Sequence, residues 1–343
     1  MPNPRVGCVI VKNGRVIGAG YTQPAGLAHA EIEALHAATK NGEDVKGATL
    51  YVTLEPCSHF GRTPPCADAL IKAGVGRVVA AIEDPNPQVA GQGLARLKAA
   101  GIQIRSGVLA NAAYECNIGF FSRMQRGKPW VRMKSAASLD GKTALHDGRS
   151  QWITSPEARA DGHAWRARAC ALLTGIGTVI HDDPLLTVRG VESPCQPLRI
   201  VIDSRLQILP NARVLQGGGT LVVTACNDPE KEKLLQDVGC EVLVLPNVTG
   251  KVDLSQLMLE LGRRGMNEVH IEAGAKLNGS LISAGCVDEL LLYIAPKLLG
   301  DARSMFELGL LSELALAKRL TFHSVGQVGP DLRILARFDR PYR

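Results

Sequence analysis

The chain has 343 residues, of which 45% are hydrophobic and 4% aromatic, and its formal net charge is +6. This length predicts two domains of about 100–200 residues each, and no apolar run is long enough to suggest a membrane span. The scarcity of aromatic residues and of blocks of like charge disfavours nucleic-acid binding, so the mild positive charge points to a small phosphate ester. The opening MPNPRVGCVIV lacks the pattern of a secretory signal, which predicts a cytoplasmic protein.

The first part of the chain alternates strands and helices. Alternating apolar residues on both sides of Asn13-Gly14 predict a β-hairpin. Further strands are expected over 48–55, 77–84 and 102–109, and helices over 28–40, 64–74 and 93–101. This alternation is typical of a three-layer α/β domain.

The polar stretch 122–134 contains Gly127 and Pro129 and predicts a domain boundary, so we expect domains at 1–124 and 129–343. In the second domain, strands are expected over 130–137, 170–175, 198–203, 219–225, 240–245, 268–273 and 288–295. Helices are expected over 155–168, 228–238, 253–264 and 275–284, with a closing hairpin over 319–338. The second domain is therefore also of the α/β class.

His29, Cys57 and Cys66 form a candidate catalytic zinc site, because such a site takes three protein ligands and keeps one position for water. The order H-x-E, then P-C, then a further cysteine is typical of zinc deaminases. In that interpretation Glu31 is not a ligand but moves protons between the water and the substrate. The nine cysteines are odd in number and scattered, which argues against a disulfide framework.

Two other interpretations of this motif are open. A structural zinc site would be closed by a fourth protein ligand, for which His36 or His59 is available. The chain would then be a zinc-stabilised binding module without catalysis. Alternatively, the same motif would serve a tRNA-editing deaminase with an accessory binding domain.

The second domain has its own candidate site. The stretch IEAGAKLNGSLI follows an expected strand and opens a helix, where Gly274 and Gly279 permit close approach of a phosphate. It is not a G-x-G-x-x-G fingerprint, so a dinucleotide-binding Rossmann domain is not supported. Arg166 and Arg189 are candidates for gripping a substrate phosphate, since guanidinium geometry favours that contact.

The sequence resembles the bifunctional riboflavin-biosynthesis deaminase/reductase of bacteria. The resemblance rests on stretches that span nearly the whole chain, among them PNPRVGCVIVKNG, HAEIEAL, VTLEPCSHFGRTPPC, AASLDGKTA, GTVIHDDPLLTVR and IEAGAKLNGSLI. It implies a cytidine-deaminase-like domain followed by a dihydrofolate-reductase-like domain, with Zn²⁺ and NADPH as cofactors. It also implies a phosphorylated pyrimidine substrate, no nucleic-acid or membrane partner, and a homo-oligomer.

The resemblance also implies site residues. It places zinc on His29, Cys57 and Cys66 and the proton shuttle on Glu31. It places NADPH contacts on Ala136, Trp152, Thr178, Asp182, Ser204, Gly274, Ala275, Lys276, Leu277, Asn278, Gly279 and Ser280. It places substrate contacts on Ser150, Arg166, Leu186, Arg189 and Glu272, with Lys134 and Lys142 as further candidates. Members of the family usually carry a helix before PNP, which we expect the deaminase domain of this sequence to lack.

Overall fold

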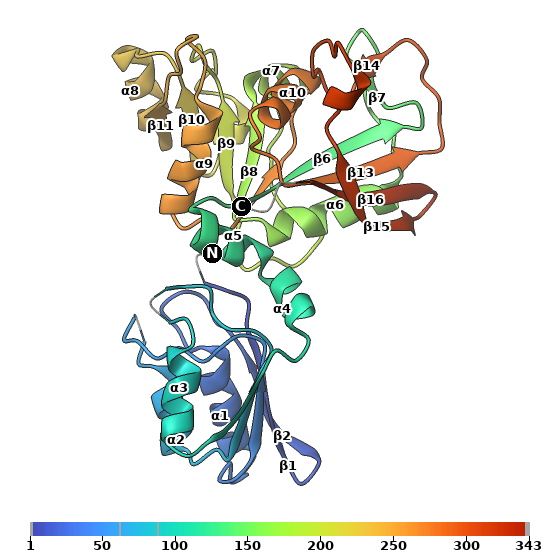
Figure 1. Cartoon of the computed structure of the whole chain (residues 1–343). Coiled ribbons are helices and arrows are strands. Elements are labelled where there is room, and N and C mark those ends of the chain that lie inside the picture. The colour runs from blue at the N-terminus through green and yellow to red at the C-terminus, as the bar shows by residue number, and fades with distance from the viewer. Residues whose placement is uncertain (1–2, 62, 88, 340–343) are drawn as a thin grey trace. The chain divides into compact units, whose positions relative to one another are not determined.

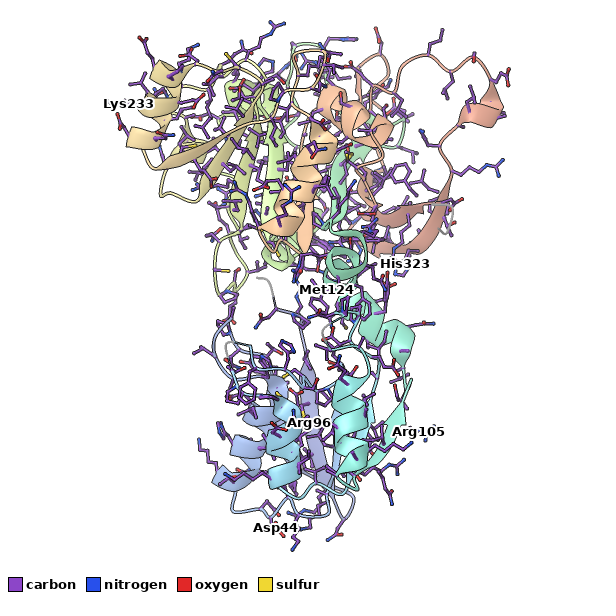
Figure 2. The ribbon with its side chains drawn as sticks, turned by 60° about the vertical axis from the view of Figure 1, so that its left-hand side comes forward. Asp44, Arg96, Arg105, Met124, Lys233 and His323 are labelled. Atoms are coloured by element: carbon purple, nitrogen blue, oxygen red, sulfur yellow. The ribbon has the colours of Figure 1, made fainter. Side chains whose placement is uncertain are left out.

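The computed structural model describes residues 3–61, 63–87 and 89–339. The chain forms two compact units, Met1–Gly127 and Lys128–Arg343 (Figure 1). The division falls inside the polar stretch 122–134. Charged side chains such as Asp44, Arg105 and Lys233 lie on the surface (Figure 2). None of the helices in the described ranges has both the length and the apolar character that a bilayer crossing requires.

The first unit is built on a five-stranded sheet in the order β2-β1-β3-β4-β5. Its strands are β1 Gly7–Lys12, β2 Arg15–Tyr21, β3 Thr49–Val52, β4 Arg77–Ala80 and β5 Gln103–Ser106. Its helices are α1 Ala30–Lys40, α2 Cys66–Lys72, α3 Gln92–Ala99, α4 Ala110–Cys116 and α5 Ile118–Arg126. The first two strands form the expected hairpin, with Asn13 and Gly14 both at positive φ, while β3, β4 and β5 run parallel.

The helix α1 lies directly on β2 because two glycines allow it. A Cβ at Gly18 would lie 2.3 Å from the carbonyl oxygen of Ala34, and one at Gly20 would lie 2.5 Å from the Ala34 nitrogen. The buried faces of α1, α2 and α3 share one apolar cluster with residues such as Ile10 and Leu50 of the sheet. This packing fixes the first turn of α1, which begins directly after His29.

The second unit is built on a nine-stranded sheet in the order β11-β10-β9-β8-β12-β6-β13-β16-β15. Its strands are β6 Trp130–Ser138, β8 Ala171–Gly175, β9 Leu198–Ile202, β10 Thr220–Thr224, β11 Cys240–Val244, β12 Glu268–Ile271, β13 Glu289–Ala295, β15 Leu320–Val328 and β16 Asp331–Phe338. All neighbours are parallel except the closing β13-β16-β15 meander, which is antiparallel. A small separate ribbon pairs β14 Arg303–Ser304 with β7 Lys142–Ala144.

Helices cover both faces of this sheet. The helices are α6 Pro156–Arg168, α7 Ile176–Asp182, α8 Pro229–Asp237, α9 Leu254–Arg263 and α10 Ala275–Ser283. The apolar side chains of α9 and α10 pack on one face, whereas those of α7 and α8 join a cluster on the other. Short 3₁₀ turns occur at Arg213–Leu215 and Leu314–Leu316. The predicted α/β class is confirmed for both units.

Some local predictions were wrong. The segment after β8 is not predicted as a helix from the sequence, but it forms the short helix α7, which starts from Gly175 as N-cap. The segments that form α4 and α5 were not predicted as helices, and α5 reaches Arg126 inside the polar stretch. The buried Phe120 and Phe121 explain α5, since they pack against Leu54. The expected strand 48–55 ends earlier, at Val52, where the chain turns toward Cys57.

A candidate zinc centre and a candidate cofactor cleft

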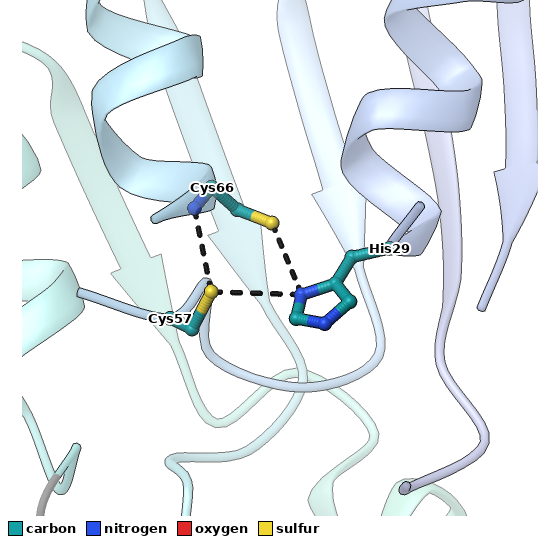
Figure 3. A group of neighbouring side chains, drawn as sticks. All are labelled: His29, Cys57 and Cys66. Atoms are coloured by element: carbon teal, nitrogen blue, oxygen red, sulfur yellow. Dashed lines mark hydrogen bonds between the residues drawn. The ribbon is translucent and has the colours of Figure 1, made fainter. Parts of the chain in front are cut away.

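The first site gathers three side chains from three elements. His29 is the N-cap of α1, Cys57 lies on the segment after β3, and Cys66 is the first residue of α2. The His29 Nδ1 atom lies 3.5 Å from Cys57 Sγ and 3.3 Å from Cys66 Sγ (Figure 3). All three ligand atoms lie within 4.8 Å of one another. The C-terminal end of β3 and two helix N-termini meet here, which brings residues distant in sequence together.

The spacing of these atoms fits a zinc ion. Tetrahedral coordination with Zn–N and Zn–S bonds of about 2.0–2.3 Å requires nitrogen–sulfur separations of roughly 3.5 Å. Over the described residues, no fourth His, Cys, Asp or Glu joins this group. The alternative fourth ligand His36 instead lies 3.9 Å from Glu33 and is 70% exposed. Three ligands with one position left for solvent are the pattern of a catalytic site.

The two thiols also fit a bound cation. A hydrogen bond from the Cys66 thiol lowers the pKa of Cys57 to about 4, and the same bond raises the pKa of Cys66. The first thiolate thus forms easily, whereas a second one beside it is repelled. A divalent ion held by both cysteines would relieve this repulsion and stabilise both thiolates.

Glu31 is the second residue of α1 and is only 4% exposed. Burial raises the pKa of this carboxyl to about 7, and the neighbouring negative Cys57 adds to the rise. A carboxyl with a pKa near neutral accepts and returns a proton readily at physiological pH. Its position beside the three ligands therefore suits proton transfer rather than coordination.

A cavity of about 480 Å³ opens beside His29. Its walls come from the segment before α1 and from the start of α2, and they include Ile32, Pro65 and Lys72. Thr63 also lines it, with its Oγ1 atom 3.5 Å from His29 Nε2. His29 thus presents Nδ1 to the sulfur atoms and Nε2 to this hydroxyl.

Sequence reasoning missed two carboxylates near the ligands, Glu55 and Asp84. Glu55 stands two residues before Cys57 and is 3% exposed. Asp84 follows β4, and burial raises its pKa to about 6, with a further contribution from the negative Glu55. The sequence carries a signal for Glu55, because a charged residue there interrupts an otherwise apolar run into the metal segment.

The second site is a cleft of about 1010 Å³ in the second unit, at the C-terminal ends of β6, β8, β9 and β12. Ligands bind at this edge of a parallel sheet. Many predicted residues line the cleft: Ala136, Ser150, Trp152, Thr178, Asp182, Glu272, Gly274, Ala275, Lys276 and Leu277. Lys134 also lines it, next to Glu272, whereas Lys142 belongs to β7 of the adjoining ribbon.

Other predicted cofactor residues are not among the residues that line the cleft. Ser204 Oγ accepts a hydrogen bond from the Val252 nitrogen at 3.1 Å. Asn278 Nδ2 donates to the carbonyl oxygens of Ala273 and Met305 at 3.1 and 3.2 Å.

Gly279 and Ser280 follow on the next turn of α10. A Cβ at Gly279 would lie 1.8 Å from the Glu307 carbonyl oxygen, so only glycine lets this segment approach α10. Ser280 Oγ bonds back to the Lys276 carbonyl of its own helix.

The segment from Arg303 to Glu307 was not predicted as part of the site. Arg303, Ser304 and Glu307 line the cleft opposite the sheet. The segment carries no motif, and its position depends on the pairing of β14 with β7 and on the close approach at Gly279. Such long-range contacts leave no local pattern in the sequence.

The predicted substrate residues divide into three environments. Glu272 lines the cleft, and Arg166 binds it from behind through Nε–Oε1 and Nη2–Oε2 contacts of 2.5 and 2.9 Å. Leu186 is 5% exposed and packs in the core cluster beneath α7. Arg189 is exposed, and its backbone nitrogen donates to His163 Nδ1 at 3.2 Å.

Trp152 is 63% exposed in the cleft, with the guanidinium of Arg159 4.2 Å from its ring centroid. This stacking holds the indole ring at the mouth of the cleft. A flat aromatic surface in that position suits contact with a ring of a bound cofactor.

Comparison with known proteins accounts for both units. Residues 1–82 match the family described as the cytidine and deoxycytidylate deaminase zinc-binding region, and residues 129–334 match the RibD C-terminal domain. The riboflavin biosynthesis protein RibD of Escherichia coli is 49% identical over 96% of this chain and 92% of its own length. The Mycobacterium tuberculosis protein of the same name is 43% identical over 96% of this chain and 90% of its own length.

Solved structures agree. Acinetobacter baumannii RibD, at 41% identity, superposes with a TM-score of 0.90 and covers 99% of this chain and 93% of that one. A Thermotoga maritima deaminase/reductase, at 32% identity, gives a TM-score of 0.87 with coverages of 98% and 93%.

The fold, the three-ligand site and the cleft together define a bifunctional enzyme that joins a zinc-dependent deaminase to an NADPH-dependent reductase. The chain belongs to the RibD family of riboflavin-biosynthesis enzymes. The resemblance drawn from the sequence is confirmed. The tRNA-editing alternative is not favoured, because the second unit matches a reductase domain.

Proposed function

We propose that the chain catalyses two successive steps on one phosphorylated pyrimidine. The first deaminates 2,5-diamino-6-ribosylamino-4(3H)-pyrimidinone 5′-phosphate, and the second reduces the ribosyl group to a ribityl chain, giving 5-amino-6-ribitylamino-uracil 5′-phosphate. The Thermotoga maritima relative, described as a diaminohydroxyphosphoribosylaminopyrimidine deaminase and 5-amino-6-(5-phosphoribosylamino)uracil reductase, supports this choice of substrate. We assign the deaminase to residues 1–124 and the reductase to residues 129–343.

In the deaminase, we assign the metal to His29, Cys57 and Cys66. Zinc, when bound, would supply a water molecule that ionises near neutral pH, as the nucleophile for the amine-bearing ring carbon. Glu31 would accept the proton of that water and pass it to the amine nitrogen, which leaves as ammonia. The observation that carries this assignment is the buried carboxyl beside three ligand atoms, with a pKa raised to about 7.

In the reductase, we assign the cofactor to the cleft between α7 and α10. NADPH, when bound, supplies the hydride. The N-terminus of α10 at Gly274 binds the pyrophosphate, and Trp152 contacts a ring of the cofactor. Glu272 accepts hydrogen bonds from the ribosyl hydroxyls and thereby orients the sugar carbon toward the hydride. Arg189, exposed beside His163, binds the substrate phosphate.

The sequence further predicts a homo-oligomer that works in the cytoplasm. Leu310 and Leu314 are 99% and 90% exposed, and apolar side chains so open to water favour burial between subunits. All nine cysteines are free, as is usual in a reducing compartment. Light scattering on the purified protein measures its mass directly, and a monomer would contradict the oligomer.

A coupled assay on the purified full chain tests the proposal. Ammonia release and NADPH oxidation are followed separately with the diaminopyrimidine phosphate as substrate. We expect both activities, and we expect a chelator to abolish ammonia release while NADPH oxidation on the deaminated intermediate continues. Ammonia release that survives complete removal of zinc would overturn the assignment of the metal site. Activity on an RNA hairpin but not on the pyrimidine phosphate would overturn the substrate.

A further inference from the structure

Glu55 is a buried carboxylate that belongs neither to the three-ligand group nor to the lining of the cavity beside it. Its Oε2 atom accepts hydrogen bonds from the backbone nitrogens of Asp84 at 3.1 Å and Gly91 at 2.9 Å. Its own nitrogen donates to the carbonyl oxygen of Ile82 at 3.0 Å. Cys57 stands two residues further along the chain, so this carboxylate lies at the start of the segment that carries the cysteine ligand.

The other oxygen of Glu55 binds the first turn of α3. Oε1 accepts from the nitrogens of Gly93 at 2.9 Å and Leu94 at 3.1 Å. Four backbone N–H groups therefore surround the carboxylate, and over the described residues no cation forms an ion pair with it. The negative charge at a helix N-terminus is further stabilised by the helix dipole.

The first turn of α3 packs closely against the segment that carries Cys57. A Cβ at Gly93 would lie 1.9 Å from the carbonyl oxygen of Pro56, the residue between Glu55 and Cys57. The segment that carries Cys57, the turn after β4 and the start of α3 thus meet around one carboxylate. A shift of any of the three segments would move Cys57 relative to His29 and Cys66.

We propose that Glu55 is a positioning residue of the deaminase, which sets the location of Cys57 by tying its segment to Asp84 and to α3. The inference rests on the proposed zinc site. Glu55 does not touch the reacting atoms and acts through Cys57. Residues that orient metal ligands in this way change metal affinity or activity by about 10–100-fold when they are altered.

The test uses Glu55→Gln in the full chain. An amide keeps the shape but offers one acceptor oxygen, and its NH₂ group points at two N–H donors. We expect zinc affinity, measured by competition with a chromogenic chelator, to fall about 10–100-fold. Hydrogen exchange at the amides of Gly91, Gly93 and Leu94 should become faster. The KM for NADPH in the reductase, an internal control on the same chain, should stay unchanged.

Two controls separate positioning from general loss of stability. Glu43→Gln removes the same charge from a half-buried side chain that pairs with the exposed Arg15, and it should leave zinc affinity unchanged. Val78→Ala opens a cavity in the fully buried core of the same unit, and it should lower the melting temperature but not zinc affinity.

Zinc affinity and exchange rates of Glu55→Gln equal to those of the wild type would overturn the proposal. So would a variant whose first unit does not fold at all, because Glu55 would then be a folding residue only. If the wild-type chain itself binds no zinc, the proposed function fails instead. The hydrogen-exchange measurement then still tests whether Glu55 holds the first turn of α3.

Discussion

Arg166 holds Glu272 through two parallel hydrogen bonds, and its third nitrogen, Nη1, donates to the Thr187 carbonyl oxygen at 2.9 Å. Each of the three guanidinium nitrogens therefore has a partner in the protein. The resemblance places Arg166 at the substrate, and in the structure it lies behind Glu272, the carboxylate that lines the cleft. The role we now propose for Arg166 is to hold that carboxylate in place.

This pairing predicts the effect of Arg166→Lys. A lysine keeps the charge but cannot make the bidentate contact, so Glu272 would lose its fixed orientation. We expect kcat/KM of the reductase to fall about tenfold or more, since a hydrogen bond to a charged group contributes about 1.5–3 kcal/mol. Deaminase activity should not change. Steady-state kinetics of both reactions check this, and an unaltered reductase would contradict the role of Arg166.

The same pair predicts a pH dependence of stability. Burial opposes ionisation of Glu272, but Arg166 and Lys134 outweigh it and hold the pKa of the carboxyl well below its usual value. A depressed pKa in the folded state contributes stability that is complete above the unfolded pKa and is lost as the pH falls through the folded pKa.

Glu272→Gln should therefore destabilise the chain by an amount that is constant at neutral pH. The difference from the wild type should shrink below about pH 4.3, the usual value for a glutamate. Urea unfolding of both proteins across this range measures it. If the difference in unfolding free energy between the two proteins grew on acidification, the pKa of Glu272 would be raised rather than lowered in the folded state.

Glu31→Gln tests the proton shuttle. The amide cannot accept a proton, so we expect deamination to slow by about 10²–10⁴-fold while zinc content stays stoichiometric. Glu33→Gln is a matched control, because Glu33 is on the same first turn of α1 but its partner is the exposed His36. Turnover by Glu31→Gln at the wild-type rate would remove Glu31 from the mechanism.

Gly279→Ala tests the wall of the cofactor cleft. The added methyl would meet the Glu307 carbonyl oxygen at 1.8 Å, so the segment that lines the cleft must move. Overpacking of this kind costs about 1–3 kcal/mol, and we expect the KM for NADPH to rise roughly tenfold. Gly162→Ala is the control, since a Cβ there meets no atom within 4 Å and should slightly stabilise α6. Equal NADPH affinity in both variants would contradict the role of this contact.

Arg189→Ala tests the phosphate contact. The side chain is exposed beside His163, and its removal takes away a charge-assisted hydrogen bond worth about 1.5–3 kcal/mol. We expect the reductase KM for the substrate to rise about 10–100-fold, with kcat and zinc content unchanged. Isothermal titration with a non-reducible substrate analogue gives the same comparison without turnover. An unchanged KM would assign the phosphate to another residue.

The spacing of apolar residues along the chain was sufficient to predict the hairpin and the regular alternation of strands and helices. The Asn13-Gly14 hairpin and the parallel strands carry periodic apolar residues, and the candidate ligands His29, Cys57 and Cys66 follow a known order of motif residues. The segment at Arg303–Glu307 and the short helix α7 were missed, because long-range packing places them. Leu186, which the resemblance places at the substrate, packs with its side chain in a core cluster, and its contact with the substrate stays a prediction.

The central strand β12 has a consequence for how the second unit assembles. Glu268 at its start binds Arg132 and Arg168, and Glu272 just past its end binds Arg166, while Val269 and Ile271 point into the opposite, apolar cluster. A slip of β12 by one residue would turn both carboxylates into that cluster and separate them from these three arginines. These three ion pairs thus disfavour misaligned insertion of β12, so charges on one face of the strand select the register in which it joins the sheet.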